Sequence, residues 1–379
     1  MDGDVIVVGA GPAGSSAAGR LAEAGLAVLL VDAAKFPRPK CCAGWLNERA
    51  VRRFPWLDRV RRRVRGAAFR RLVFHSPDLG RRAAFSSRSH LGYIVPRARF
   101  DYELVRAARA AGARTVFGQR VVAACAGERE AAVTLQRGRR LTARVLVGAD
   151  GTLSDVARLT GLRHAWPASA LVHCLARDVR LTPRALAAGL GAGQIHIALA
   201  FGGAAGYAWA FPGTGYASVG VGVRDGQAPR LADLYAQWVD GLKRAGLLPA
   251  RADASKPCAG AVPAGAAIEF EEHVGKRTVL VGDAGGFAAA ASGEGIYPGM
   301  WSAALAAECI RKAVAADRPQ SGAASCQDEL LRFRHLWRRE MAAYLQMPNV
   351  NLQFLLPLVF SNQEITNRFA RALLFGENL

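Results

Sequence analysis

A glycine-rich turn near the start of the chain constrains the fold more than any other feature. It runs Gly9-Ala-Gly-Pro-Ala-Gly14 and stands between a short apolar run, residues 4–8, and an Ala- and Leu-rich stretch, residues 13–25. A second apolar run follows at residues 27–31. A buried strand, a helix and a second strand within about 30 residues predict a βαβ unit with parallel strands.

Each glycine of this turn has a separate task in a nucleotide site. Gly9 permits the tight turn, Gly11 lets the backbone approach a pyrophosphate, and Gly14 lets helix and strand pack closely. The helix that begins near Ala13 offers unpaired N–H groups and a positive dipole end to phosphates. Asp32 closes the second strand and is placed to accept hydrogen bonds from a ribose. We therefore predict a dinucleotide site, and the acid favours FAD or NAD over NADP.

Two later motifs favour FAD. Gly148-Ala-Asp150-Gly151 and Leu280-Val-Gly282-Asp283 each follow a strand-like run. A second acid far along the chain from Asp32 fits a cofactor that spans the domain, with Asp283 holding ribityl hydroxyls. The helix that begins near Gly293-Glu-Gly-Ile296 would direct its positive end at the pyrimidine edge of a flavin. Either aspartate alone could equally be a turn or helix-capping residue.

These motifs resemble the FAD-dependent oxidoreductases of the p-hydroxybenzoate hydroxylase fold, over roughly residues 3–315. Within that fold the chain is most similar to the geranylgeranyl reductase family. Phe36–Leu46 resembles the family's loop beside the flavin, with Cys42 on the family's cysteine. Tyr207-Ala-Trp-Ala-Phe-Pro212 matches its Y-x-W-x-F-P motif, and Arg97-Ala-Arg-Phe-Asp101 resembles an R-x-x-F-D turn whose arginine lies near the FAD.

The chain departs from the family pattern at three positions. Ala43 stands where glycine is usual, Trp45 where the family has a small residue, and Asp32 where glutamate is commoner. The first two departures concern the flavin-side loop, and hence the substrate.

The resemblance implies an FAD-dependent oxidoreductase that reduces carbon–carbon double bonds of an isoprenoid or other lipophilic substrate by hydride transfer from N5 of reduced flavin. The motifs and the resemblance together give these expected cofactor contacts: Gly9, Gly11, Ala13, Gly14, Asp32, Cys42, Ala43, Arg97, Val122, Asp150, Asp283, Gly293, Gly295 and Ile296. The expected catalytic and substrate-wall residues are Cys42, Tyr207 and Trp209. No second nucleotide motif is visible, so NAD(P)H would visit the flavin transiently, or reduced ferredoxin would supply electrons.

Alternation supports the aromatic part of this site. Tyr207, Trp209 and Phe211 share one face of a strand by their spacing of two, and they offer a flat apolar wall with polar tips. Such a wall suits an isoprenoid chain over a flavin, although the same pattern also describes an aromatic sheet face packed into the core. Cys42 could likewise be a bystander thiol.

We expect an α/β (α+β) fold in which a Rossmann-like FAD-binding domain carries an inserted mixed β-sheet and a helical C-terminus. The pattern predicts helices over 47–65, 100–112, 231–246 and 294–317, strands over 114–124, 131–136, 144–148 and 278–282, and a β-rich region over 170–223. The expected domains are FAD-binding over 1–75, 96–165 and 274–320, substrate-binding over 76–95 and 166–273, and C-terminal helical over 321–379.

Arginine gives the chain its strong basicity. Lys and Arg total 50 against 30 Asp and Glu, a net charge of +20, and only six of the basic residues are lysine. Residues 49–99 hold 15 arginines and two acids. Nucleic acid, an anionic membrane surface, and an anionic or carrier-bound substrate all fit such an excess, as does compositional bias.

Three other functions compete with the reductase. A flavin halogenase needs a lysine near the flavin, and none occurs between Lys40 and Lys243, which argues against halogenation. An aromatic monooxygenase using NAD(P)H and O₂ stays open because the same flavin activates O₂. An RNA-binding flavoprotein is suggested only by the arginines of residues 59–65, which lack the interleaved exposed aromatics of specific RNA readers.

The remaining features concern compartment. Seven cysteines without a C-x-x-C pair predict reduced thiols, no disulfide framework and no metal site. There is no basic leader, and no apolar run reaches the about 18–20 residues of a spanning helix. We expect a cytoplasmic protein that could be peripheral to the membrane. Leu352–Phe360 could dock on a membrane or line a lipophilic tunnel, and a capped helix in the core is the favoured alternative.

Overall fold

The computed structural model describes residues 1–317, 325–347 and 352–378, and within them it leaves out some side chains, such as those of residues 225, 227, 352 and 353. The chain divides into two compact units, which are described separately. The first unit comprises Met1–Arg38, Asp101–Trp166 and Pro263–Gln346, and the second comprises Pro39–Phe100, Pro167–Val262 and Met347–Leu379. Residues 39–75, which we expected in the FAD-binding domain, thus group with the second unit, and the predicted domain boundaries stay a prediction.

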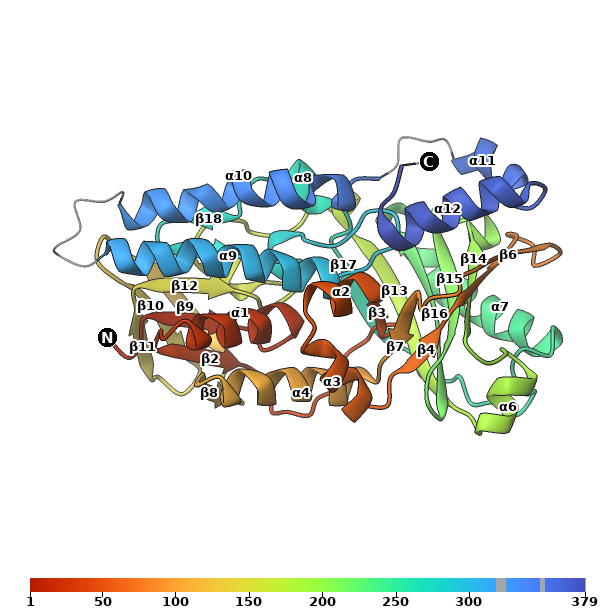
Figure 1. Ribbon diagram of the computed structural model, residues 1–379, viewed down its shortest axis with the longest axis horizontal. Helices are drawn as coiled ribbons and strands as arrows, with labels where there is room; N and C mark the ends of the chain where they lie inside the picture. Colours follow the sequence, from red (N-terminus) through yellow and green to blue (C-terminus); the bar gives the residue numbers. More distant parts are fainter. Residues whose placement is uncertain (318–324, 348–351, 379) are drawn as a thin grey trace. The chain divides into compact units, whose positions relative to one another are not determined.

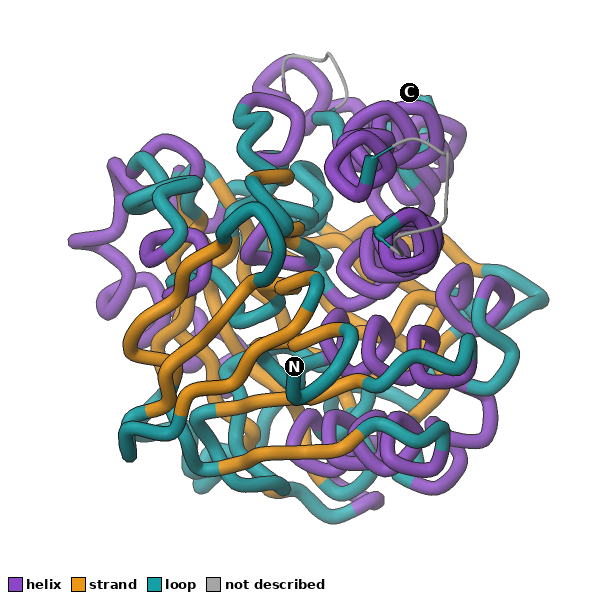
Figure 2. The backbone as a smooth tube through the Cα atoms, turned by 90° about the vertical axis from the view of Figure 1, so that its left-hand side faces the viewer, coloured by secondary structure: helices purple, strands orange, loops and turns teal. Residues whose placement is uncertain are grey.

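The first unit is built on a six-stranded sheet in the order β18-β19-β12-β1-β2-β8. Its strands are β18 (Val274–Gly275), β19 (Thr278–Leu280), β12 (Val145–Gly148), β1 (Val5–Val8), β2 (Val28–Asp32) and β8 (Arg114–Phe117). All pair in parallel except β18. The N-terminus leads directly into the central strand β1, whose four residues are buried, as an apolar run in a doubly covered parallel sheet should be (Figure 2).

Helices and a small second sheet complete this unit. Its helices are α1 (Pro12–Glu23), α5 (Asp155–Leu159), α8 (Ala266–Glu269), α9 (Ile296–Ala316) and α10 (Cys326–Leu345), with the 3₁₀ turn η4 (Gly282–Gly285). Helix α4 (Arg97–Ala110) leads into it from the second unit. An antiparallel sheet of β9 (Val121–Ala126), β10 (Ala131–Leu135) and β11 (Arg140–Ala143) shares a hydrophobic core with the main sheet.

The second unit is built on a seven-stranded sheet in the order β17-β13-β16-β15-β14-β5-β6 (Figure 1). Its strands are β17 (Cys258–Val262), β13 (Val172–Arg180), β16 (Tyr216–Arg224), β15 (Gly206–Pro212), β14 (Gln194–Leu199), β5 (Arg71–His75) and β6 (Arg82–Ser86). Only β14 and β5 pair in parallel. Helix α7 (Leu231–Arg244) packs on the face that carries Ala208 and Ala210, so Tyr207, Trp209 and Phe211 point to the opposite face.

Short elements surround this sheet. A three-stranded sheet pairs β3 (Trp45–Asn47), β7 (Gly92–Ile94) and β4 (Ala67–Phe69). The other elements are α2 (Glu48–Arg53), α3 (Leu57–Arg63), α6 (Pro183–Ala188), α11 (Leu352–Val359) and α12 (Gln363–Phe375), with 3₁₀ turns η1 (Ala168–Ala170), η2 (Phe201–Gly203) and η3 (Asp225–Arg230).

The mixed α/β architecture with a helical C-terminus confirms the expected fold class. Two predicted elements are each divided in two. The helix over 47–65 is α2 and α3, interrupted at Pro55, because proline disfavours helical backbone in the residue before it. The strand over 114–124 is β8 and β9, separated at Gly118, whose φ of 71° turns the chain into another sheet.

Candidate functional site

The glycine turn between β1 and α1 is a cradle that only glycine can form. A side chain at Gly9, whose φ is 99°, would lie 2.2 Å from the carbonyl oxygen of Ala149. A side chain at Gly14 would lie 1.7 Å from the carbonyl oxygen of Gly9. Above Gly11 the only atom within 4 Å of the Cβ position is Nη2 of Arg38, at 3.8 Å. The turn is therefore closed toward the sheet and open above Gly11, which fits a pyrophosphate at the N-terminus of α1.

Asp32 is fixed to this turn by backbone hydrogen bonds. Its Oδ2 accepts from the N–H of Ala10 at 2.7 Å, and its Oδ1 accepts from the N–H of Ala34 at 2.8 Å. The residue is only 9% exposed. Each carboxylate oxygen keeps a second lone pair, so the pair of oxygens remains able to accept from ribose hydroxyls.

Arg38 is a candidate pyrophosphate contact that the sequence did not single out. Its Nη1 lies 3.5 Å from Oδ2 of the fully buried Asp101, and its guanidinium lies 4.9 Å from the centre of the Phe36 ring. These contacts hold Nη2 near Gly11, where a cation complements phosphate. The only sequence signal was the Pro-Arg-Pro run inside Phe36–Leu46, because Asp101 lies far along the chain.

Three small residues bring the late motif against the glycine turn. A Cβ at Gly282 would lie 2.8 Å from Cβ of Ala13, and a Cβ at Gly299 would lie 3.4 Å from Cα of Gly282. Ser302 closes the contact, because its hydroxyl accepts from the N–H of Gly282 at 3.0 Å and donates to the carbonyl of Gly299 at 2.8 Å. The first turns of α1 and α9 and the turn η4 therefore meet in one place within the first unit.

Asp283 lies at the N-terminus of α9. A Cβ on Gly295, the residue before the helix, would be 3.0 Å from Oδ1 of Asp283. Gly293 has a φ of 65°, and Ile296 is the buried first residue of the helix. The structure thus brings the glycine turn together with Asp283, Gly295 and Ile296. The contacts of these residues with FAD stay a prediction.

Asp150 caps a helix. The Ser154 hydroxyl donates to its Oδ1 at 2.5 Å, and the N–H of Val156 donates to its Oδ2 at 3.0 Å. Burial raises the pKa of Asp150, and these hydrogen bonds oppose that rise. The capping role that the sequence left open is therefore present, and a cofactor contact stays a prediction. A cofactor contact at Val122, which is 49% exposed on β9, also stays a prediction.

The Cys42 loop belongs to the second unit. The N–H of Gly44 donates to the Cys42 sulfur at 3.3 Å. Gly44 has a φ of 74°, and a Cβ there would lie 2.4 Å from the carbonyl oxygen of Val95. Ala43 does not have a positive φ, so the loop requires glycine only at position 44, and the departure from the family at Ala43 is sterically tolerated. Arg97 is the first residue of α4, three residues after the end of β7.

The aromatic side chains of β15 are more buried toward the end of the strand. Phe211 is fully buried and contacts Trp45 edge-on at 6.4 Å, Trp209 is 5% exposed, and Tyr207 is half-buried. The Trp209 ring lies over Gly220, where a Cβ would approach it to 2.2 Å, and its Nε1 donates to the Ser218 hydroxyl at 3.4 Å. Trp209 is therefore held in one orientation, and Tyr207 offers the more accessible surface.

The thiols of Cys41, Cys174 and Cys258 form a group beside this loop that no spacing in the sequence indicated. The Cys41 sulfur donates to the carbonyl of Cys258 at 3.1 Å, and the Cys258 sulfur donates to the carbonyl of Ala176 at 3.1 Å. The sulfurs of Cys41 and Cys174 both lie against Gly260. Hydrogen bonding to Cys174, together with burial, raises the pKa of Cys41, which makes Cys41 a poor nucleophile.

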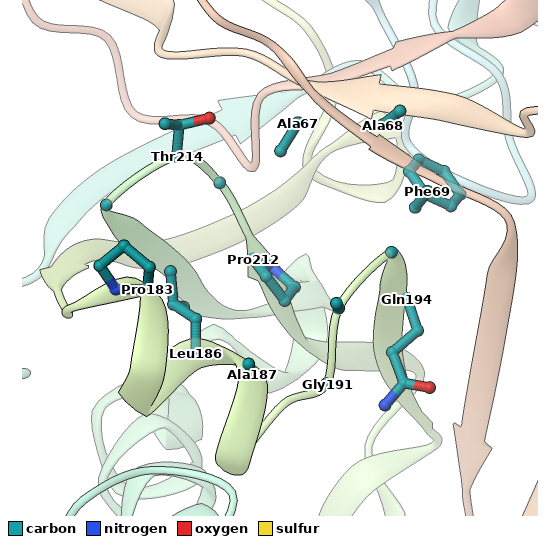
Figure 3. Close-up of a pocket in the computed structure, with 14 residues that line it drawn as sticks. Ala67, Ala68, Phe69, Pro183, Leu186, Ala187, Gly191, Gln194, Pro212 and Thr214 are labelled. Atoms are coloured by element: carbon teal, nitrogen blue, oxygen red, sulfur yellow. The ribbon is translucent and has the colours of Figure 1, made fainter.

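An apolar cavity of about 210 Å³ lies in the second unit (Figure 3). Pro183 and Leu186 of α6 and Pro212 at the end of β15 line it opposite Ala68 and Phe69 of β4. None of the predicted site residues lines this cavity.

Known proteins resemble the chain throughout its length. The model of the FAD binding domain family matches residues 2–185. A menaquinone reductase of Mycolicibacterium smegmatis is 32% identical over an alignment of 368 positions, which covers 91% of this chain and 85% of that protein. The chain belongs to the geranylgeranyl reductase family. It is an FAD-dependent oxidoreductase, and the glycine cradle described above fits that cofactor.

The chain is also similar to one further reductase and to solved structures. A digeranylgeranylglycerophospholipid reductase of Methanosarcina mazei is 29% identical and covers 83% of this chain and 76% of its own length. A geranylgeranyl bacteriochlorophyll reductase-like structure from Thermoplasma acidophilum superposes with a TM-score of 0.79 at 20% identity, over 99% of this chain and 97% of that one. The halogenase PltM superposes with a TM-score of 0.74 at 17% identity, over 99% of this chain and 80% of that one. The two structural likenesses concern the fold alone.

Proposed function

We propose that this family member reduces carbon–carbon double bonds in an isoprenoid or other lipophilic substrate. The observation that carries the proposal is that relatives aligned over more than four-fifths of the chain are named as reductases of two lipophilic molecules, menaquinone and digeranylgeranylglycerophospholipid. The aromatic face of β15 supports it through Tyr207, whose half-buried ring contacts Trp209 and is the part of that face that an apolar chain could reach.

The chain's own residues would divide the work as follows. Gly11 and the N-terminus of α1 would hold the pyrophosphate with Arg38, and Asp32 would hold a ribose. Asp283 and the start of α9 would hold the ribityl chain and the flavin ring. Bound FAD, once reduced, would supply a hydride from N5.

The second unit would position the substrate. Trp209, fixed by Ser218, would orient an apolar chain, and Tyr207 would contact it along its exposed side. Cys42 as a contact of the flavin stays a proposal from the family resemblance. The electron donor would be NAD(P)H or reduced ferredoxin, and the substrate could be presented on an anionic carrier or in a membrane.

Anaerobic reoxidation of the reduced holoenzyme tests the reaction. Polyprenyl substrates of several head groups are added without oxygen, the flavin absorbance is followed, and the product mass is measured. We expect reoxidation with a gain of two hydrogens per double bond. If every substrate leaves the flavin reduced, but oxygen and NAD(P)H yield a product that has gained an oxygen atom, the enzyme is a monooxygenase and the proposal is wrong.

Two variants separate the cofactor site from the substrate site. Asp283→Ala is expected to purify without FAD, whereas Trp209→Ala is expected to keep FAD and change turnover. Asp240→Ala, an exposed residue on α7, is the control for loss of a carboxylate. Full flavin absorbance in purified Asp283→Ala would contradict the assigned cofactor contact.

A further inference from the structure

Helix α11 carries apolar side chains on the side that faces solvent. From Phe354 to Val359 every residue is apolar. Val359 is fully buried, whereas Phe354 is 79% exposed and Leu358 is 46% exposed. Pro357 is exposed as well, and positions 354, 357 and 358 share one face of a helix. A short helix that is apolar all round but covered on one side is unusual on a protein surface exposed to water alone.

Two large exposed apolar side chains lie one helical turn apart on α11. Six large hydrophobic side chains are exposed in the described part of the chain, and Phe354 and Leu358 are two of them. Met1, Val122 and Leu153 belong to the first unit, and Met347 follows α10. Single exposed apolar side chains need no explanation, but a cluster does.

The helix is held rigidly on the second unit. The Thr366 hydroxyl on α12 donates to the carbonyl of Val359 at 2.6 Å, which ties α11 to α12. Phe369 on α12 packs edge-on against Phe74 of β5 with ring centres 5.4 Å apart. Gln363 donates from Nε2 to the carbonyl of Ala84 on β6 at 2.9 Å. Helix α11 is therefore attached through α12, which packs at the edge strand β6 of the sheet (Figure 1).

That neighbouring edge is basic. The β5–β6 segment, residues 71–90, holds four arginines and one acid, Asp78. Arg81 and Arg82 are exposed, and the Arg81 guanidinium lies 5.9 Å from the ring centre of Phe360, next to α11. The arginines of α12 contribute no excess, because Arg368 pairs with Glu364 and Arg371 with Glu377, each at 2.8 Å.

We propose that α11 and the tip of the β5–β6 hairpin form a docking surface for a membrane that contains anionic phospholipids. Phe354, Pro357 and Leu358 enter the acyl-chain boundary, and Arg81 and Arg82 contact the lipid phosphates. The pairing of an apolar helix face with adjacent uncompensated arginines matches an anionic bilayer surface better than a second copy of this chain, whose own surface carries the same basic excess. This inference stands whether or not the proposed reduction is correct.

Vesicle flotation of the purified holoenzyme tests the surface. Vesicles of phosphatidylcholine with about 30% phosphatidylglycerol are compared with vesicles of phosphatidylcholine alone. We expect the wild type to float with the anionic vesicles and Phe354→Ser/Leu358→Ser to bind them at least about tenfold more weakly. Leu153→Ser, which removes an 85% exposed leucine from the first unit, is the matched control and should bind like the wild type.

A charge variant tests the arginines separately. Arg81→Glu/Arg82→Glu should lose binding to anionic vesicles by about tenfold, whereas Arg62→Glu/Arg63→Glu, an equal charge change on α3, should lose much less. Retained FAD and an unchanged melting temperature confirm that the variants fold. The proposal is overturned if the serine variant binds as tightly as the wild type, or if both arginine variants lose binding equally. It is also overturned if gel filtration shows a wild-type dimer that the serine variant dissociates while vesicle binding is absent.

Discussion

Gly14 shows how the absence of one side chain permits a nucleotide cradle. Its Cβ position lies 1.7 Å from the carbonyl oxygen of Gly9, so even alanine would push α1 away from β1. Gly14→Ala should therefore purify with little or no FAD, measured as flavin absorbance per protein. Gly19→Ala is the control, because a Cβ at that position of the same helix approaches no atom closer than 3.5 Å. Equal FAD content in the two variants would show that the cradle tolerates side chains.

Two buried histidines give the second unit a dependence on pH. Nε2 of His196 lies 2.7 Å from the carbonyl of Leu190 and therefore donates to it, so Nδ1 of His196 accepts from Nε2 of His75 at 2.9 Å. Both rings are thus neutral. Burial lowers the pKa of His75 to about 3 and that of His196 to about 4.

The free energy of unfolding should fall in acid because of this pair. The folded-state pKa values lie below the ordinary value of about 6.5, so the stabilisation is complete above pH 6.5 and is lost as the pH falls toward 4. Each histidine contributes up to about 1.4 kcal/mol per pH unit in that window. His75→Gln keeps a donor toward His196 without titrating, and its melting temperature should depend less steeply on pH. His164→Gln, at an exposed position, should leave the slope unchanged.

At the residue scale, sequence reasoning predicted backbone geometry where the interactions are local. The tight turn at Gly9 and Gly14 and its hydrogen bond to Asp32 lie within one βαβ unit, while the contact of these residues with FAD stays a prediction. Arg38 and the thiols around Cys41 were missed because their partners are brought to them only by tertiary folding. The role of Asp150 was left open because a strand-end aspartate reads the same as a cap or as a ligand.

At the scale of elements, periodicity placed most helices and strands and failed at single interruptions. Residues 13–25 and 294–317 were predicted as helices and are α1 and α9 within a few residues. The predicted helix over 47–65 and strand over 114–124 each contain a residue, Pro55 and Gly118, that outweighs the apolar pattern around it. Hydrophobic periodicity is averaged over many residues and does not register one proline or glycine, but that residue ends the helix or strand.

The Arg277 side chain contacts three elements of the first unit. Its Nε donates to the carbonyl of Glu128 at 2.8 Å, and Nη1 donates to the carbonyl of Arg144 at 3.2 Å. Its Nη2 lies 2.7 Å from Oδ1 of Asp317, at the C-terminus of α9. Arg277 is 7% exposed. One side chain therefore holds the β9–β10 turn, the start of β12 and the end of α9 together.

Replacing the buried Arg277 should cost more stability than replacing an exposed basic residue. Arg277→Met removes the donor to two carbonyls and to Oδ1 of Asp317, whose Oδ2 keeps Arg144 at 2.9 Å, and should lower the free energy of unfolding by about 2 kcal/mol in urea denaturation. The neighbouring Lys276→Met removes an exposed ion pair to Glu128 and should cost less than about 1 kcal/mol. Equal effects would mean that the buried network adds nothing.

For the whole molecule, the net charge of +20 has a narrower meaning than its size suggests. In the arginine-rich segment Arg61 and Arg62 both pair with Asp58, and Arg61 lies 4.2 Å from the centre of the Tyr93 ring. Some of the excess arginines thus make contacts within the folded chain. No helix among the described residues is long and apolar enough to cross a membrane.

RNA binding is therefore expected to be non-specific. Mixed RNA should bind weakly at about 50 mM salt, and the affinity should fall by roughly two orders of magnitude or more by about 200 mM. Filter binding at several salt concentrations measures the slope. A sequence preference that survives at the higher salt would revive the RNA-binding alternative.

The order of strands in the first sheet has a consequence for synthesis on the ribosome. Strand β12 lies between β1 and β19, and α9 packs on α1, so segments from the start and the late part of the chain must meet. All seven strands of the second unit's sheet have been synthesised by Val262, before β19 and α9 are made. A nascent chain can therefore complete the sheet of the second unit first. At that stage the sheet that carries the nucleotide cradle still lacks β19, although the cradle itself comes first in the sequence. Until β19 is made, β12 is an unpaired edge strand, and this apolar edge is the surface that a chaperone would need to shield during translation.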